Sequence, residues 1–151
     1  MKQQLLEIQE VRLINTNSSK RPNGHYSQAT LIGNTLYLSA QLPDTTYSDQ
    51  SKDIEQQVER QTRSILDNIT TIAQSAGATR NSIALVRFYS TDIKLWPIID
   101  QAFSDYMGDH KPARAVICVA AIKHGYLVMA EAIAEIKPIA EEQGHGHYLY
   151  R

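Results

Sequence analysis

The sequence has 151 residues, with 15 lysines and arginines against 16 aspartates and glutamates, and a formal net charge of -1. This length fits a single domain, and the balanced charge argues against a protein that neutralises a nucleic-acid backbone. Cys118 is the only cysteine and the N-terminus lacks the apolar core of a signal peptide, so we expect a cytoplasmic protein without a disulfide framework or a multi-cysteine metal site.

The first part of the chain predicts three strands. Residues 5–14, 27–32 and 35–42 have strand character, and a segment rich in Asn, Ser, Pro and Gly separates the first from the second. Gly33-Asn34 lies between the second and third, and this dipeptide suits the positive φ angles of a two-residue turn. We therefore expect a hairpin at this point.

A long helix follows a polar loop. Apolar residues recur at helical spacing over residues 54–76, and Asp53 and Gln56 are spaced as a capping pair at its start. Gly77 is the residue type that ends a helix in the left-handed conformation.

The second half predicts a strand, a helix and two more strands. Residues 83–89 alternate as a strand does, and residues 96–107 form a helix with proline in its first turn. Residues 114–122 and 126–136 are the last strands, and Lys123-His124-Gly125 between them suits a hairpin turn.

The predicted order of elements is β-β-β-α-β-α-β-β, which favours an α+β fold with one mixed sheet and two helices on one face. The strand over residues 115–122 is apolar on both faces, so its second face needs cover from another subunit. We expect one domain over residues 1–137 and a C-terminal tail over residues 138–151. The tail contains His145 and His147, which are too few ligands for a closed metal site.

Five short motifs occur in order along the chain: Gly24-His25-Tyr26-Ser27-Gln28-Ala29, Leu38-Ser39-Ala40-Gln41-Leu42-Pro43, Leu66-Asp67-Asn68-Ile69, Ala76-Gly77 and Pro112-Ala113-Arg114. Together they resemble the Rid (YjgF-type) family of enamine and imine deaminases over residues 26–136. The resemblance implies a chorismate-mutase-like fold, a homotrimer, and ligand clefts at the subunit boundaries. It also implies hydrolysis of 2-imino acids to 2-keto acids and ammonia, with no metal or organic cofactor.

By this resemblance Arg114 binds the carboxylate of a small substrate. A planar guanidinium pairs with a carboxylate through two charge-assisted hydrogen bonds, which lysine does less well. The alternative is an ordinary ion-pair partner at the start of a strand, and the Pro-Ala-Arg context favours the ligand. Pro112 has no N–H to pair and fits the first residue of a strand at a cleft rim.

The other expected site residues come from three segments. Tyr26 resembles a cleft tyrosine that donates to substrate or orders a water, with a packing aromatic as the alternative. Ser39 and Gln41 resemble residues that line the same pocket. Val116 shares the strand face of Arg114 and is expected to contact substrate.

The sequence departs from the family on the last strand. Deaminating members have a glutamate where this chain has Met129, and a thioether cannot accept a proton. Glu131 lies two residues further along the same strand face, displaced by about 6.6–6.8 Å. If the preceding turn shifts the register, Glu131 becomes the acid–base residue. On the second helix, Asp100 stands where the family often has asparagine.

Three functions are therefore open. The first is an imine or enamine deaminase with an altered substrate range. The second is a non-catalytic protein that binds a 2-keto acid or similar carboxylate through Arg114, and Met129 is the residue that separates these two. The third is a ribonuclease, which the balanced charge and the lack of a basic, aromatic-interleaved groove argue against.

Overall fold

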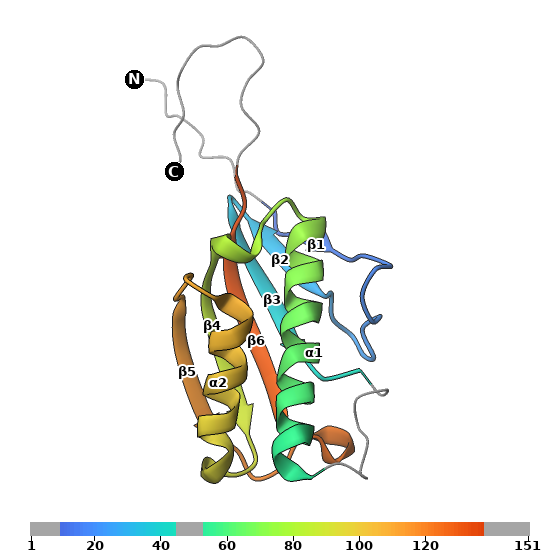
Figure 1. Cartoon of the computed structure of the whole chain (residues 1–151). Coiled ribbons are helices and arrows are strands. Elements are labelled where there is room, and N and C mark those ends of the chain that lie inside the picture. The colour runs from blue at the N-terminus through green and yellow to red at the C-terminus, as the bar shows by residue number, and fades with distance from the viewer. Residues whose placement is uncertain (1–9, 45–52, 138–151) are drawn as a thin grey trace, which may run out of the picture.

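The computed structural model describes residues 10–44 and 53–137 (Figure 1). It contains six strands and two long helices among these residues, together with three short 3-10 turns. The strands are β1 (Arg12–Ile14), β2 (Ala29–Ile32), β3 (Thr35–Gln41), β4 (Ile83–Ser90), β5 (Ala113–Cys118) and β6 (Val128–Glu135). The helices are α1 (Ile54–Ser75) and α2 (Trp96–Met107), and the 3-10 turns are η2 (Arg80–Ser82), η3 (Ile93–Leu95) and η4 (Lys123–Gly125).

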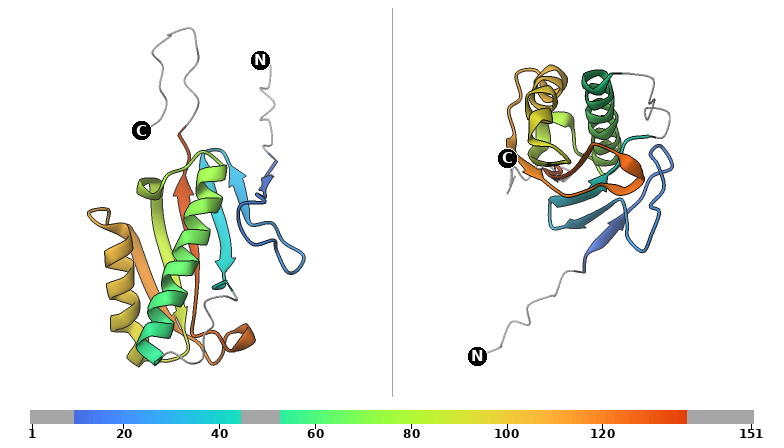
Figure 2. Two further views of the ribbon diagram at one scale, coloured as in Figure 1. Left: turned by 45° about the vertical axis from the view of Figure 1, so that its right-hand side comes forward. Right: turned by 90° about the horizontal axis from the view of Figure 1, so that it is seen from below.

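The strands form one mixed sheet in the order β1-β2-β3-β6-β4-β5. Only β4 and β5 are parallel, because α2 carries the chain back between them, and the other neighbours are antiparallel. The predicted element order, the mixed sheet and the two helices on one face are confirmed. Figure 2 shows both helices on the same side of the sheet.

The hairpin between β2 and β3 is also confirmed. Ile32 lies opposite Thr35, so the turn contains only Gly33 and Asn34. Gly33 takes the positive φ of 57° that a side chain at this position would oppose.

The predicted hairpin between the last two strands is wrong. β6 pairs with β3 and β4, and β4 lies between β6 and β5. The local turn signal was sound, since His124 and Gly125 both have positive φ. The chain nevertheless leaves the sheet after Cys118 and re-enters it two positions away, which a local turn signal does not encode.

Several boundaries also differ. The first strand begins at Arg12, with residues 5–9 outside the described part of the chain, and β5 ends at Cys118 instead of continuing to residue 122. The tail over residues 138–151 lies outside the described residues as well. In the described part, no helix is both long and apolar enough to cross a membrane.

The hydrophobic core lies between the sheet and the helices. Helix α1 begins where predicted, with the Asp53 side chain accepting a hydrogen bond of 2.8 Å from the Gln56 N–H. Its buried face packs on the sheet, and Phe103 of α2 meets Phe88 of β4 edge to face at 5.3 Å between ring centroids. The fully buried members include Leu36, Ile65, Leu66, Ile69, Ile72, Val86 and Val128.

The opposite face of the sheet carries no helix of the described chain (Figure 2). Tyr37 on this face is 47% exposed and Ile117 on β5 is 41% exposed. The segment expected to be buried on both faces is thus an edge strand that the single chain leaves open. Cys118, at the end of this strand, is also exposed.

Candidate functional site

A cavity of about 670 Å³ opens beside β3 and β6. Its walls come from the loop before β2, the end of β3, the turn η4 and the middle of β6. The lining residues are Lys20, Arg21, Pro22, Asn23, Tyr26, Gln28, Ser39, Ala40, Gln41, Leu42, Lys123, His124, Tyr126, Met129 and Glu131.

The fold brings five of the expected site residues into this one pocket. Tyr26 comes from the loop before β2, Ser39 and Gln41 from β3, and Met129 and Glu131 from β6. Met129 and Glu131 lie on the same strand face, as their spacing predicts.

One buried glutamine fixes the loop that forms the outer wall. Gln28 is 1% exposed, and its side-chain amide donates to the carbonyls of Lys20 at 2.8 Å and Thr16 at 3.1 Å. Its side-chain oxygen accepts from the Thr16 N–H at 2.6 Å. Because this segment has no strand partners for these groups, Gln28 supplies the hydrogen bonds that hold it in place.

The inner wall is held by short polar contacts on β3. The Ser39 hydroxyl donates to the Ser27 carbonyl at 2.7 Å, and the Gln41 amide donates to the Ser39 carbonyl at 3.0 Å. A break in the β3–β6 register between Leu38 and Gln41 lies here, which turns the strand and opens the space beside it.

Polar residues on the buried face of α1 hold the remaining rim. Asn68 donates to the Leu42 carbonyl at 3.3 Å, and Gln61 accepts from the Leu127 N–H at 2.8 Å. Both residues are buried, with exposed fractions of 7% for Asn68 and 2% for Gln61. Sequence reasoning missed these positioning roles, although polar residues at apolar helix positions were the available signal.

Glu131 is held by two partners that the sequence did not reveal. Its carboxylate accepts from Arg87 at 2.5 Å and from the Tyr89 hydroxyl at 2.7 Å. Burial raises the pKa of Glu131, but the hydrogen bonds from Tyr89 and Arg87 and the arginine charge outweigh it, so its pKa lies below the ordinary value. The hydrogen bond to Glu131, burial and the carboxylate charge raise the pKa of Tyr89. Glu131 is therefore a carboxylate already occupied by donors.

Tyr26 stands at the mouth of the pocket. It is 51% exposed, and its hydroxyl oxygen accepts from the Asn23 N–H at 3.3 Å. The hydroxyl proton remains available to donate toward the pocket.

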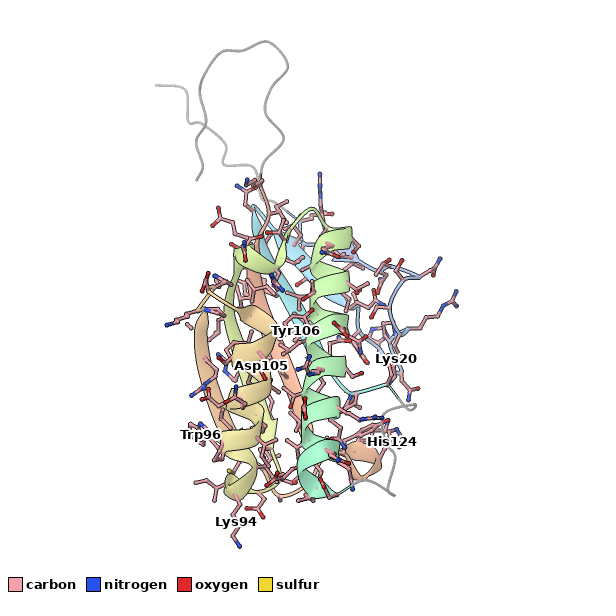
Figure 3. All side chains as sticks on the ribbon, viewed as in Figure 1. Lys20, Lys94, Trp96, Asp105, Tyr106 and His124 are labelled. Carbon is pink, nitrogen blue, oxygen red and sulfur yellow. The ribbon has the colours of Figure 1, made fainter. Side chains whose placement is uncertain are left out.

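Arg114 is not in this pocket. It lies opposite the buried Val86 on the helix side of β5, and β4 separates β5 from β6, so within one chain Arg114 does not lie beside Met129, as a hairpin between the last two strands would have placed it. Its guanidinium pairs with Asp100 and lies 5.7 Å from the centre of the Trp96 ring. Figure 3 shows Trp96 on the side of the molecule opposite Lys20 and His124 of the pocket.

Val116 is also outside the pocket. It lies opposite Phe88 and packs against the hydrophobic core, because residues 114 and 116 share the strand face that points toward the helices. Within residues 10–44 and 53–137, no group of three or more histidine, cysteine, aspartate or glutamate side chains is placed to hold a metal ion. His145 and His147 fall outside these ranges.

A family model described as Endoribonuclease L-PSP matches residues 16–136. The chain belongs to the Rid/YjgF/RutC family. A RutC family protein of Pyrococcus abyssi is 30% identical over 122 residues, covering 81% of this chain and 94% of that protein. A 2-iminobutanoate/2-iminopropanoate deaminase of Capra hircus is 31% identical over 128 residues, covering 85% and 92%.

Solved structures of the family have the same fold. A Rid family protein of unknown function from Yersinia pestis is 32% identical, with a TM-score of 0.73 over 84% of this chain and 100% of that one. RidA from the Antarctic bacterium Psychrobacter is 30% identical, with a TM-score of 0.70 over 83% and 99%.

Proposed function

We propose that the protein hydrolyses reactive 2-imino acids, and the enamines that give rise to them, to 2-keto acids and ammonia without a metal or organic cofactor. The observation that carries this proposal is the pocket, which gathers Tyr26, Ser39, Gln41, Met129 and Glu131 from separate segments. The resemblance to Rid deaminases selects Tyr26, Ser39 and Gln41, and it places the family glutamate at the position of Met129, two residues before Glu131. A goat relative at 31% identity bears the name of such a deaminase.

The proposed site needs a second subunit to supply Arg114. Within one chain this arginine lies beyond β4 and on the other face of the sheet. The free edge of β5, with Ile117 41% exposed, supports an arrangement in which β5 of one subunit meets the pocket of the next in a homotrimer. Arg114 uses one nitrogen on Asp100, which leaves guanidinium donors for a substrate carboxylate.

The chemistry requires addition of one water. Its oxygen bonds to the carbon of the protonated C=N group, a proton passes to nitrogen, and the C–N bond of the resulting carbinolamine breaks to release ammonia and leave the keto oxygen. The protonated imine is already electrophilic, so a site that fixes the carboxylate and directs water accelerates the reaction by orientation. Tyr26 is the donor or water-ordering group in this scheme.

A second candidate is a non-catalytic or diverged protein that binds 2-keto acids. Met129 cannot accept a proton, and the Glu131 carboxylate already accepts from Arg87 and Tyr89. The pocket therefore has weak provision for activating water, while its capacity to hold a small carboxylate is unaffected.

The decisive experiment compares Arg114→Ala with Arg80→Ala. The two arginines are matched, because Arg80 also lies over an aromatic ring, at 5.9 Å from the centre of Tyr106. Arg114→Ala should weaken calorimetric binding of 2-oxobutanoate by about 2–5 kcal/mol, because the ligand carboxylate loses a charged partner. Arg80→Ala should leave binding as in the wild type.

Turnover is measured in parallel by trapping imines, generated in situ from several L-amino acids, with semicarbazide. Accelerated imine loss in the wild type that disappears with Arg114→Ala supports the deaminase. Binding of the keto acid without any acceleration supports the second candidate, and undiminished binding by Arg114→Ala shows that the anchor is another residue.

A further inference from the structure

Four basic residues line the outer part of the pocket, and neither the deaminase scheme nor Arg114 accounts for them. Lys20 and Arg21 belong to the loop before β2, while Lys123 and His124 belong to η4. Figure 3 shows Lys20 and His124 on the same side of the molecule. These four residues are called the basic rim below.

The charge of the basic rim is not neutralised within the described chain. Of the lining residues that the structure describes, Glu131 is the one acidic side chain, and it is paired with Arg87 outside the rim. Among the described residues, no rim side chain lies within ion-pair distance of a carboxylate. The Lys20 ammonium donates to the carbonyl of Pro43 at 3.1 Å, which orients it without cancelling its charge.

Buried side chains fix the first loop of the basic rim. The amide of Gln28 binds the backbone carbonyl of Lys20 itself at 2.8 Å, and Gln28 is 1% exposed. The backbone that carries Lys20 and Arg21 is therefore held in place, so less of the loop has to become ordered when a ligand binds.

The second loop is fixed in a comparable way. His124 has a φ of 62°, in the left-handed region that few residues other than glycine adopt, and its ring meets that of the buried Tyr126 edge to face at 6.2 Å. Gln61 holds the following Leu127 N–H. Both loops thus have an anchored backbone, and both carry basic side chains that line the same pocket.

We propose that the basic rim binds a second anionic group, so that the ligand is a small acid with two anionic groups. Its first carboxylate lies at Arg114, which rests on the function proposed above, and its second carboxylate or phosphate lies at the rim. A cavity of about 670 Å³ has room for such a molecule in addition to the reacting group. Charge-assisted hydrogen bonds from lysine and arginine are the contacts that recognise this chemistry.

A single-stranded nucleic acid is a poorer fit to the same residues. Proteins that bind it use an extended positive groove for several nucleotides together with stacked aromatic side chains. Here the four basic residues of the rim line a single pocket, and the net charge of the chain is -1.

The test compares three keto acids in calorimetric titrations of the full-length protein. 2-Oxoglutarate carries a second carboxylate, 3-phosphooxypyruvate carries a phosphate, and 2-oxopentanoate has the carbon chain of 2-oxoglutarate without the second charge. We expect 2-oxoglutarate or 3-phosphooxypyruvate to bind roughly tenfold or more tightly than 2-oxopentanoate, with a preference that falls as salt is added. The tighter of the two identifies the anion.

In the variant Lys20→Met/Arg21→Met, the tighter-binding of 2-oxoglutarate and 3-phosphooxypyruvate should bind with nearly the same affinity as 2-oxopentanoate, so that the ratio of these two affinities is close to one. Lys94→Met is the matched control, since Lys94 lies in η3 away from the pocket, and it should keep the ratio (Figure 3). Circular dichroism confirms that each variant is folded. Equal affinities for all three acids in the wild type would overturn the proposal, and so would a preference that survives the double substitution. A short single-stranded RNA that displaces 2-oxoglutarate at a lower concentration than 3-phosphooxypyruvate does would also overturn it.

The experiment also separates this proposal from the deaminase. If the protein prefers an acid with two anionic groups through the basic rim but does not turn over imines, the second anion site is supported and the deaminase is rejected. If it turns over imines but binds all three acids equally, the deaminase is supported and the second anion site is rejected.

Discussion

The pocket beside β3 and β6, called the pocket end here, and the edge of the sheet at β5, called the open end, are built in different ways. At the pocket end, loops are held by buried amides such as Gln28, Gln61 and Asn68, each of which bonds to backbone groups. At the open end, β5 has one neighbouring strand among the described residues and leaves Ile117 exposed. The loops of the pocket are thus held by contacts within one chain, whereas the β5 edge has the chemistry of a surface that needs a partner.

This difference separates the expected site residues. Tyr26 and Met129 line the pocket, and Arg114 lies on the edge strand β5. If the protein is the trimer that we propose, the site joins one end of a subunit to the other end of its neighbour. The predictions below test this arrangement, beginning with the largest effect.

Met129→Glu should change the rate of imine hydrolysis most. A carboxylate at the position where the resemblance places the family glutamate supplies an acid–base group, which contributes about 10²–10⁴-fold in favourable cases. Semicarbazide-trapped turnover measures the effect, and Glu131→Gln is the companion variant. If Met129→Glu leaves the rate unchanged while Glu131→Gln abolishes it, Glu131 is the acid–base residue, and the position of Met129 does not correspond to that of the family glutamate.

Ile117→Asp should break the assembly at the open end. A charge placed in an apolar contact between subunits costs several kcal/mol because it is desolvated without a partner. Light scattering at micromolar concentration should show a trimer for the wild type and a smaller species for the variant. Ile93→Asp is the control, since Ile93 is 66% exposed in η3 and not in the sheet. A monomeric wild type would reject both the trimer and the shared cleft.

Gln28→Ala should destabilise the pocket end. It removes four side-chain hydrogen bonds to Thr16, Ser19 and Lys20 and leaves backbone groups without partners, at a cost of about 2–3 kcal/mol. Chemical denaturation measures the loss. Gln101→Ala is the control, because within the described part of the chain the Gln101 side chain bonds only to Asp105, on the exposed surface of α2, and its loss should change stability by less than about 0.5 kcal/mol. Equal stability of the two variants would show that the loop is held by other contacts.

The smallest effect concerns the pH dependence that Glu131 contributes. Its pKa is lowered in the folded protein, so its stabilisation is present above the unfolded pKa and is lost as the pH falls through the folded pKa. At fixed protein concentration, the wild type should therefore lose more stability than Glu131→Gln on acidification below the ordinary range of a glutamate. Solvent screening of this partly exposed pair keeps the difference below about 1 kcal/mol. Identical acid profiles would contradict the proposed ionic contact with Arg87.

The sequence by itself determined the elements and their order. The period of the apolar residues located α1, and the start of each helix was encoded locally by Asp53 and Pro97. The Gly33-Asn34 turn fixed the β2–β3 register for the same reason. The motifs also named residues of the pocket, because Tyr26, Ser39 and Gln41 lie within short segments whose spacing is local.

The tertiary structure decided which strands are neighbours and which side chains meet. A turn at His124-Gly125 looks the same whether the next strand pairs with β5 or enters between β3 and β4, so the position of β6 depended on contacts far apart in sequence. The pairing of Glu131 with Arg87 crosses from β6 to β4, and the separation of Arg114 from Met129 follows from the same strand order. Local periodicity fixes the face on which a residue lies, but only the long-range packing of the sheet fixes what lies beside it.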